Sequence, residues 1–233
     1  MTALSAKLQA VRRRIADACQ VAGRDPASVR LLAVSKTFPA EAVRELAAAG
    51  QAAFGENYAQ EGAAKVAALE SLGLEWHFIG PLQSNKTRTI ANHFSWVHSL
   101  EREKIADRLS EQRDAHLPPL NVCIQVNVSG EASKSGVAPE AVLPLARHVE
   151  TLPRLRLRGL MAIPEPSEDA AVLRARFAQV RRLREQLADA GLALDTLSMG
   201  MSADLEAAIA EGATLVRVGS ALFGVRPAPL PAN

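Results

Sequence analysis

The stretch LLAVSKTFP at residues 31–39 is where the sequence decides its fold. Its first four residues are apolar without alternation, which is typical of a parallel strand that helices cover on both faces. The strand runs into Lys36, and residues 37–39 interrupt it. A lysine at the end of a buried strand is unusual, because its charged form loses water on burial. The same loss favours a neutral, nucleophilic amine, which Schiff-base formation requires. A lysine that simply reaches solvent is the alternative, and the rest of the chain has to decide between the two.

Seven further apolar runs follow, separated by stretches of helical pattern. Together the eight runs cover residues 30–36, 52–57, 75–80, 94–100, 120–128, 155–163, 196–200 and 214–220. Eight strand–helix units in about 200 residues predict a single-domain (β/α)8 TIM barrel of the α/β class. An open, doubly wound sheet is the alternative. That fold usually has fewer strands and a glycine-rich first turn, and no GxGxxG pattern follows Lys36.

Signals of helix ends and apolar stripes occur between the strands. Pro39 stands at a plausible first helical position and Gly50 at a C-terminal cap. Ser167 is expected to precede a long helix, and Ser202 is expected to cap a helix over residues 203–211. Two stripes at helical spacing are expected to be buried: Leu4, Leu8, Val11 and Ile15 in an extra N-terminal helix, and Leu173, Phe177, Val180 and Leu187 after Ser167.

Composition excludes several classes of protein. A net charge of +2 over 233 residues is too small to indicate a nucleic-acid partner. Cys19 and Cys123 are isolated and the five histidines lack metal-ligand spacing, so neither a disulfide framework nor a metal site is expected. No apolar run reaches the roughly 18 residues of a membrane span, and the N-terminus has no signal-peptide pattern, so a cytoplasmic protein is expected. Residues 1–226 are expected to form the barrel and residues 227–233 an irregular tail.

Candidate site residues lie at the C-terminal ends of the predicted strands, which form the active face of such a barrel. They are Lys36, Asn57, Met161, Ser198, Gly200, Ser202, Arg217, Gly219 and Ser220. After the seventh and eighth strands, small residues let backbone N–H groups approach a phosphate, and serine hydroxyls add donors. Arg217 is either half of a structural ion pair or a fixed cation at the barrel mouth. An amine, a phosphate cradle and an arginine are the set expected for pyridoxal 5′-phosphate (PLP).

Six segments together make the chain resemble a known family. They are AVSK at 33–36, FGENY at 54–58, HFIGPLQSNK at 77–86, SKSG at 133–136, LSMGMS at 197–202 and VRVGS at 216–220. The chain is similar to the pyridoxal phosphate homeostasis proteins, single-domain relatives of the N-terminal barrel of alanine racemase. The resemblance implies a fold-type III PLP barrel with the cofactor as an internal aldimine on Lys36 and with Arg217 facing the pyridine nitrogen. It also implies that the serines and glycines from Ser198 to Ser220 named above surround the phosphate, and that the protein serves intracellular vitamin B6 and amino-acid homeostasis.

An arginine opposite the pyridine nitrogen favours a carrier over an enzyme. An acidic partner would keep that nitrogen protonated, whereas an arginine leaves the ring a weaker electron sink. Racemisation also requires a second acid or base on the opposite face of the substrate. We therefore expect a non-catalytic PLP carrier, with PLP-dependent apo-enzymes as candidate recipients. A low-activity amino-acid racemase using Lys36 with Tyr58 or His77 is the alternative, and a Schiff-base aldolase is a weaker one.

Two further expectations concern a second amine and the oligomeric state. Lys134 lies in a polar loop after the fifth strand and is the runner-up amine, either solvated or with a secondary role in holding or transferring the cofactor. A monomer is expected, because the chain has no second domain that would complete a dimeric site.

Overall fold

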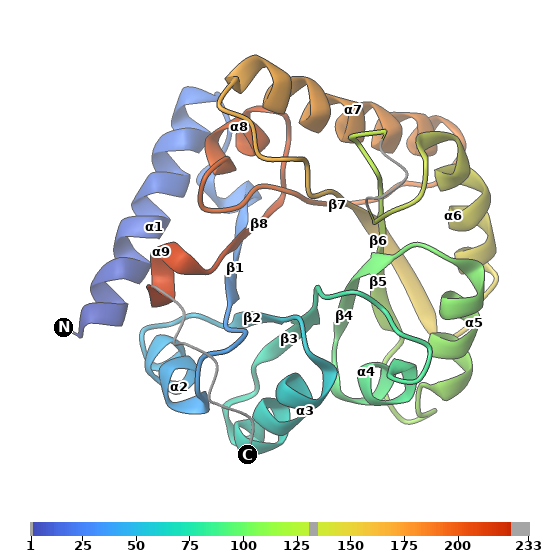
Figure 1. The fold of residues 1–233 in the computed structure, drawn as a ribbon, viewed down its shortest axis with the longest axis horizontal. Coiled ribbons are helices and arrows are strands. Elements are labelled where there is room, and N and C mark those ends of the chain that lie inside the picture. The colour runs from blue at the N-terminus through green and yellow to red at the C-terminus, as the bar shows by residue number, and fades with distance from the viewer. Residues whose placement is uncertain (1, 131–134, 225–233) are drawn as a thin grey trace.

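Eight parallel strands close into one barrel (Figure 1). The computed structural model describes residues 2–130 and 135–224. Its strands are β1 Arg30–Val34, β2 Ala53–Glu56, β3 Glu75–Phe78, β4 Trp96–Leu100, β5 Leu120–Gln125, β6 Leu155–Met161, β7 Thr196–Ser198 and β8 Leu215–Val218. Each strand pairs with the next in the chain, and β8 pairs in parallel with β1. The predicted (β/α)8 barrel is confirmed, and the pairing of β1 with β8 excludes the open sheet.

Helices surround the barrel and cover the outer faces of its strands (Figure 1). They are α1 Ala3–Val21, α2 Ala40–Ala48, α3 Ala59–Ala68, α4 Thr87–His93, α5 Glu103–Gln112, α6 Val142–Glu150, α7 Ala170–Asp189, α8 Leu205–Ala210 and α9 Ser220–Phe223, with short 3-10 turns at Pro26–Ser28, Glu70–Leu72 and Pro139–Ala141. The extra N-terminal helix α1 packs against α8 and α9. Within the described ranges, no helix combines the length and the apolar character that a membrane crossing needs.

Burial follows the predicted pattern. Every residue of β4 and β8 is buried, because one side faces the barrel interior and the other faces helices. The stripe of α7 (Leu173, Phe177, Val180 and Leu187) is buried in full. In α1, Leu8, Val11 and Ile15 are buried as expected, whereas Leu4, in the first turn, is only partly buried. Gly50 follows the C-cap of α2 with a φ of 87°, as expected of a helix-terminating glycine.

Three predicted helix starts are wrong by one or two residues. Pro39 is the N-cap of α2 rather than its first helical residue. Asp169 caps α7 by accepting a hydrogen bond from the backbone N–H of Ala171, and Ser167 lies two residues before it. Helix α8 begins after Asp204, not after Ser202. The Asp204 carboxylate accepts the Met201 N–H at 2.5 Å, and this side-chain contact folds the preceding residues into a turn that delays the helix.

The strands are shorter than the apolar runs that predicted them. The run at residues 120–128, for example, outlasts β5 by three residues. Val126 and Val128 are buried although they lie beyond the strand, and Val126 forms only an isolated bridge to Val137. Apolar loop residues that pack on the barrel mouth therefore extend the sequence pattern past the true strand end.

Candidate functional site

Lys36 lies at the C-terminal mouth of the barrel, two residues beyond the end of β1. Its partly buried side chain lines a small pocket of about 30 Å³. The other lining residues are Val34, Phe38, Gly219, Ser220 and Gly224. The pocket joins the ends of the paired strands β1 and β8. The candidate amine and the loop after β8 therefore face the same space.

The loops after β7 and β8 bring two serine hydroxyls together. The Oγ atoms of Ser202 and Ser220 are 3.4 Å apart, and Ser220 is exposed. A Cβ at Gly219 would lie 3.4 Å from the Val34 carbonyl oxygen, so this loop runs close to the end of β1. Gly200 has a φ of 95°, and a Cβ there would lie 2.6 Å from the Ala208 Cβ. Small residues thus allow a tight turn and leave hydroxyl and backbone donors at the mouth, which fits a phosphate group.

Arg217 is a buried cation directly below this mouth. Its Nη1 donates to the carbonyl oxygen and to the Oγ of Ser198, at 2.6 and 2.7 Å, and its Nη2 donates to the Ala162 carbonyl oxygen at 2.9 Å. Burial lowers the pKa of Arg217 to about 10, so the guanidinium stays charged at neutral pH. These bonds use three of its five N–H donors, and the described residues offer the other two no hydrogen-bond acceptor. An arginine with unused donors fits a ring nitrogen that accepts a hydrogen bond.

The remaining predicted site residues occupy two different depths. Asn57 follows β2 at the mouth and is partly buried. Its Oδ1 is buried, and no hydrogen-bond donor reaches it from residues 2–130 or 135–224. Met161 is fully buried in the barrel, where it packs with Trp96 and Cys123. The hydroxyl of Ser198 is likewise engaged inside the barrel, by Arg217 and His98. Lys134 lies outside the described residues.

A buried ionic cluster that sequence reasoning missed supports the backbone around Lys36. The Lys65 amine donates to Glu56 Oε1 and Glu61 Oε1, both at 2.7 Å, and to the Ser35 carbonyl oxygen at 2.8 Å. Ser35 Oγ also donates to Glu56 Oε1 at 2.6 Å. Burial raises the pKa of Glu56, against the opposing pull of Lys65. We call these four residues the Lys65 cluster; only the four-residue spacing of Glu61 and Lys65 on α3 could have indicated part of it.

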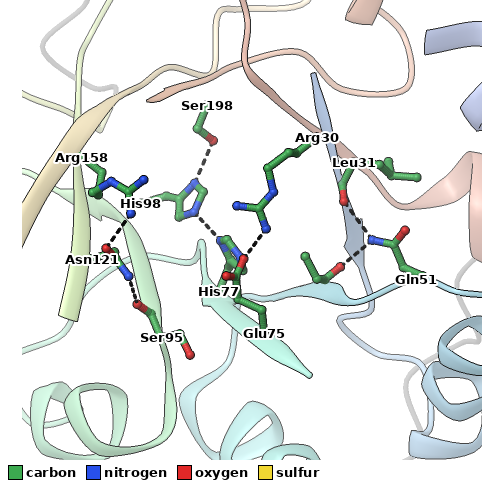
Figure 2. Close-up of polar contacts among 11 residues, drawn as sticks. Arg30, Leu31, Gln51, Glu75, His77, Ser95, His98, Asn121, Arg158 and Ser198 are labelled. Carbon is green, nitrogen blue, oxygen red and sulfur yellow. Dashed lines mark hydrogen bonds and ion pairs between the residues drawn. The ribbon is translucent and has the colours of Figure 1, made fainter. Parts of the chain in front are cut away.

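A second missed feature is a file of polar side chains through the barrel interior (Figure 2). Ser198 Oγ contacts His98 Nδ1 at 2.8 Å, His98 Nε2 contacts His77 Nδ1 at 2.8 Å, and His77 Nε2 contacts Glu75 Oε1 at 2.7 Å. Arg30 also binds Glu75, at the N-terminal end of the strands. Both histidines are fully buried. The available signal was a single histidine within each of two neighbouring strands, His77 in residues 75–78 and His98 in residues 96–100.

These positions bear on the two side chains considered as a second catalytic base. Both ring nitrogens of His77 are hydrogen-bonded inside the barrel, away from the mouth. Tyr58 is 56% exposed on the loop after β2.

Among the described residues, no group of three or more histidine, cysteine, aspartate or glutamate side chains could hold a metal ion.

Known proteins resemble the chain along nearly its whole length. The family model for the alanine racemase N-terminal domain matches residues 6–227. The chain is 65% identical to the pyridoxal phosphate homeostasis protein of Pseudomonas aeruginosa, over 100% of both chains. It is 52% identical to the protein of the same name from Escherichia coli K12, over 97% of this chain and 98% of the other.

Solved structures agree with this relationship. PipY from Synechococcus elongatus PCC7942, solved with PLP bound, has a TM-score of 0.79 and 41% identity, covering 90% of this chain and 100% of PipY. Alanine racemase from Corynebacterium glutamicum has a TM-score of 0.66 at 18% identity, covering 95% of this chain and 62% of the racemase, which shows a common fold. By its family match and its relatives of more than half identity, the chain belongs to the pyridoxal phosphate homeostasis proteins, which are built on the alanine racemase N-terminal domain.

Proposed function

We propose that the protein binds PLP at the mouth of its barrel through a Schiff base on Lys36, and that it serves PLP homeostasis as a carrier rather than as an efficient enzyme. The observation that carries the proposal is the pocket shared by Lys36, Gly219 and Ser220 above the buried Arg217. The names of its relatives and the PLP-bound PipY structure support the choice of cofactor.

Each part of the pocket has a task in this proposal. The Lys36 amine would condense with the aldehyde of the cofactor with loss of water, and Ser202, Ser220 and the backbone near Gly219 and Gly200 would hold the phosphate. The Arg217 guanidinium would donate to the pyridine nitrogen and, because it cannot supply a proton, would leave that nitrogen unprotonated. PLP supplies an electrophilic carbon and an electron sink. The chain's own contribution is to bind, orient and shield it.

The carrier role is favoured over racemisation by the surroundings of Tyr58 and His77. His77 has both nitrogens occupied in the barrel interior, and Tyr58 is largely exposed. Incubation with amino acids in deuterated water decides the matter. Sustained, Lys36-dependent exchange of the α-hydrogen would sink the carrier proposal in favour of the racemase.

The proposal also covers the location, the oligomeric state and the partners of the protein. We further propose that the protein is a cytoplasmic monomer that passes PLP to apo-enzymes. Sedimentation of the PLP-loaded protein tests the monomer, and reactivation of a PLP-dependent apo-enzyme tests transfer. A dimer whose disruption abolishes PLP binding would contradict the first point.

The covalent attachment is tested by Lys36→Ala, with Lys104→Ala as the matched control on the exposed surface of α5. We expect the purified parent and the Lys104 variant to be yellow and to show the absorbance band of bound PLP. The Lys36 variant loses that band, because it lacks the amine. Borohydride reduction should place the cofactor on the peptide that contains Lys36. A parent that stays colourless after incubation with PLP would overturn the proposal, and a colourless protein that borohydride links to a phosphorylated sugar would favour an aldolase.

A further inference from the structure

The interior polar file connects the candidate cofactor site to the opposite end of the barrel. Arg217 contacts Ser198 at the C-terminal end of β7. From Ser198 the contacts pass through His98 of β4 and His77 of β3 to Glu75, the first residue of β3 (Figure 2). Each contact is 2.7 or 2.8 Å. The three residues between the two ends are fully buried. Such closely spaced, buried polar groups have to pair with one another.

The two ends fix the direction of every hydrogen bond in this file. A guanidinium can only donate, so Ser198 Oγ accepts from Arg217. An ionised carboxylate can only accept, so His77 Nε2 donates to Glu75. The hydrogen bond from His77 is the main reason that the pKa of Glu75 falls to about 2, which keeps this carboxylate ionised.

The directions of the two inner hydrogen bonds, His98–His77 and Ser198–His98, follow from the fixed directions at Arg217 and Glu75. Neutral His77, protonated on Nε2, offers Nδ1 as an acceptor, so His98 must donate to it from Nε2. His98 Nδ1 is then an acceptor and receives a hydrogen bond from the Ser198 hydroxyl. A protonated His77 would reverse the two inner bonds and leave the Ser198 hydroxyl proton without its acceptor. Burial disfavours a charge on His77, and Arg30 repels it, against the opposing pull of Glu75. For His98, burial is likewise the main cause, and Arg217 and Arg30 both repel a charge there.

We propose that Ser198, His98 and His77 are positioning residues that hold the Arg217 guanidinium for the PLP ring through hydrogen bonds running in one direction, from Arg217 to Glu75. This inference rests on the proposed function. Ser198 offers Arg217 an oxygen lone pair, because His98 accepts the hydroxyl proton. Glu75 in turn fixes the tautomer of His77 and thereby that of His98. Arg217 can therefore donate its remaining N–H groups toward the ring. The carboxylate of Glu75, which orients Arg217 through the file, lies at the other end of the barrel.

The tautomers are tested directly by ¹⁵N NMR of the full-length protein labelled on histidine. We expect both His77 and His98 to be neutral and to carry their proton on Nε2, in protein with and without PLP. A proton on Nδ1 of either ring at neutral pH would overturn the directional file. This measurement needs neither PLP nor a variant, so it stands whether or not the proposed function holds.

The effect on the cofactor is tested by Ser198→Ala, with Ser99→Ala as the matched control. Ser99 is also a buried serine of the barrel, but its hydroxyl donates to the Gly80 carbonyl oxygen. We expect Ser198→Ala to bind PLP about tenfold more weakly, the loss typical of one hydrogen bond to a charged group. The absorbance maximum of bound PLP should shift as well, because Arg217 loses one of the three hydrogen bonds that orient it and keeps only those to the Ser198 and Ala162 carbonyl oxygens. Ser99→Ala should change neither quantity.

The outcomes separate the two proposals. Equal affinity and an unchanged spectrum in the folded Ser198 variant would overturn the positioning role while leaving PLP binding intact. A parent protein that fails to bind PLP would overturn the proposed function and, with it, the role toward the ring. If Ser198→Ala does not fold, the histidine tautomers of the parent decide the inference.

Discussion

Lys36 is held from both sides through the backbone of its neighbours. Ser35 is fixed by its carbonyl oxygen and its hydroxyl within the Lys65 cluster. On the other side, the Thr37 N–H donates to Glu61 Oε1 at 2.6 Å. Thr37 has a φ of 67°, a left-handed conformation that costs a residue with a Cβ about 1–2 kcal/mol. The cluster therefore compensates a strained backbone and sets the point from which the Lys36 side chain departs.

Replacing Lys65 by methionine tests the cluster. Methionine keeps most of the side-chain volume but leaves the buried Glu56 carboxylate without its cation. Loss of one partner of a buried ion pair costs about 3–5 kcal/mol, so we expect the free energy of unfolding to fall by that amount. The rate of PLP loading should fall too, because the Lys36 backbone loses support. Urea unfolding and the absorbance of bound PLP measure the two effects.

The double variant Lys65→Met with Glu56→Gln is the informative companion. It removes both charges, so we expect it to recover part of the stability that the single variant loses. Lys104→Met, on the exposed face of α5, controls for loss of a lysine. A Lys65→Met protein as stable as the parent would show that the cluster does not support the fold.

At the level of single elements, the turn between β7 and α8 is the most constrained part of the site. Gly200 has a φ of 95° there, and its neighbour across the turn is Ala208 in α8. The turn carries Ser202 to within 3.4 Å of Ser220. Any side chain at Gly200 would push α8 away from the strand and separate those hydroxyls.

Gly200→Ala and Gly191→Ala distinguish that crowding from backbone strain alone. Gly191 also has a positive φ, 87°, but a Cβ there would meet nothing within 4 Å. We expect Gly191→Ala to lower the free energy of unfolding by about 1–2 kcal/mol, from the backbone alone. Gly200→Ala should cost about 2–4 kcal/mol, because overpacking adds to the strain, and it should also weaken PLP binding. Chemical unfolding gives both costs, and equal values for the two variants would contradict the crowding.

The sequence predicts elements better than it predicts partners across the barrel. Continuous apolar runs predicted the positions of all eight strands, because a strand buried on both faces is apolar along its own local sequence. The helix starts at Ser167 and Ser202 were wrong, because Asp169 caps α7 in place of Ser167, and Asp204 holds the residues before α8 in a turn through Met201. Among the contacts of the Lys65 cluster and the histidine file, the one between His98 and Ser198 joins residues 100 positions apart in the chain. No local signal predicts such contacts until strand order and register are known.

At the scale of the whole molecule, closure of the barrel creates an interior that the polar file crosses from one end to the other. Folding takes His77 and His98 entirely out of water. Burial lowers the pKa of His77 and lowers that of His98 well below its ordinary value. Both rings therefore stay neutral in the folded protein at a pH where the unfolded chain would charge them. Global stability is thereby linked to pH.

The sign of that link follows from proton counts. Below about pH 6.5 the unfolded chain binds protons that the folded chain does not, so stability falls as the pH decreases. Each fully buried histidine contributes a slope of up to about 1.4 kcal/mol per pH unit. Glu75 acts in a lower window. Its pKa of about 2 in the folded protein means that its contribution is present above about pH 4.5 and is lost as the pH falls toward 2.

Urea unfolding of the parent, His98→Gln and His116→Gln between about pH 7.5 and 5 tests this linkage. His116 is exposed and outside the file, so it is the matched control. We expect the parent and the His116 variant to lose stability with the same slope below about pH 6.5. The His98 variant should be less stable at neutral pH, because the file is broken. Its loss of stability per pH unit should be smaller, by the contribution of one buried histidine. Glutamine does not titrate, so residue 98 in the variant binds the same number of protons in the folded and the unfolded chain. If the His98 variant keeps the full slope, the buried rings do not supply the pH dependence, and the neutral file from Arg217 to Glu75 is wrong.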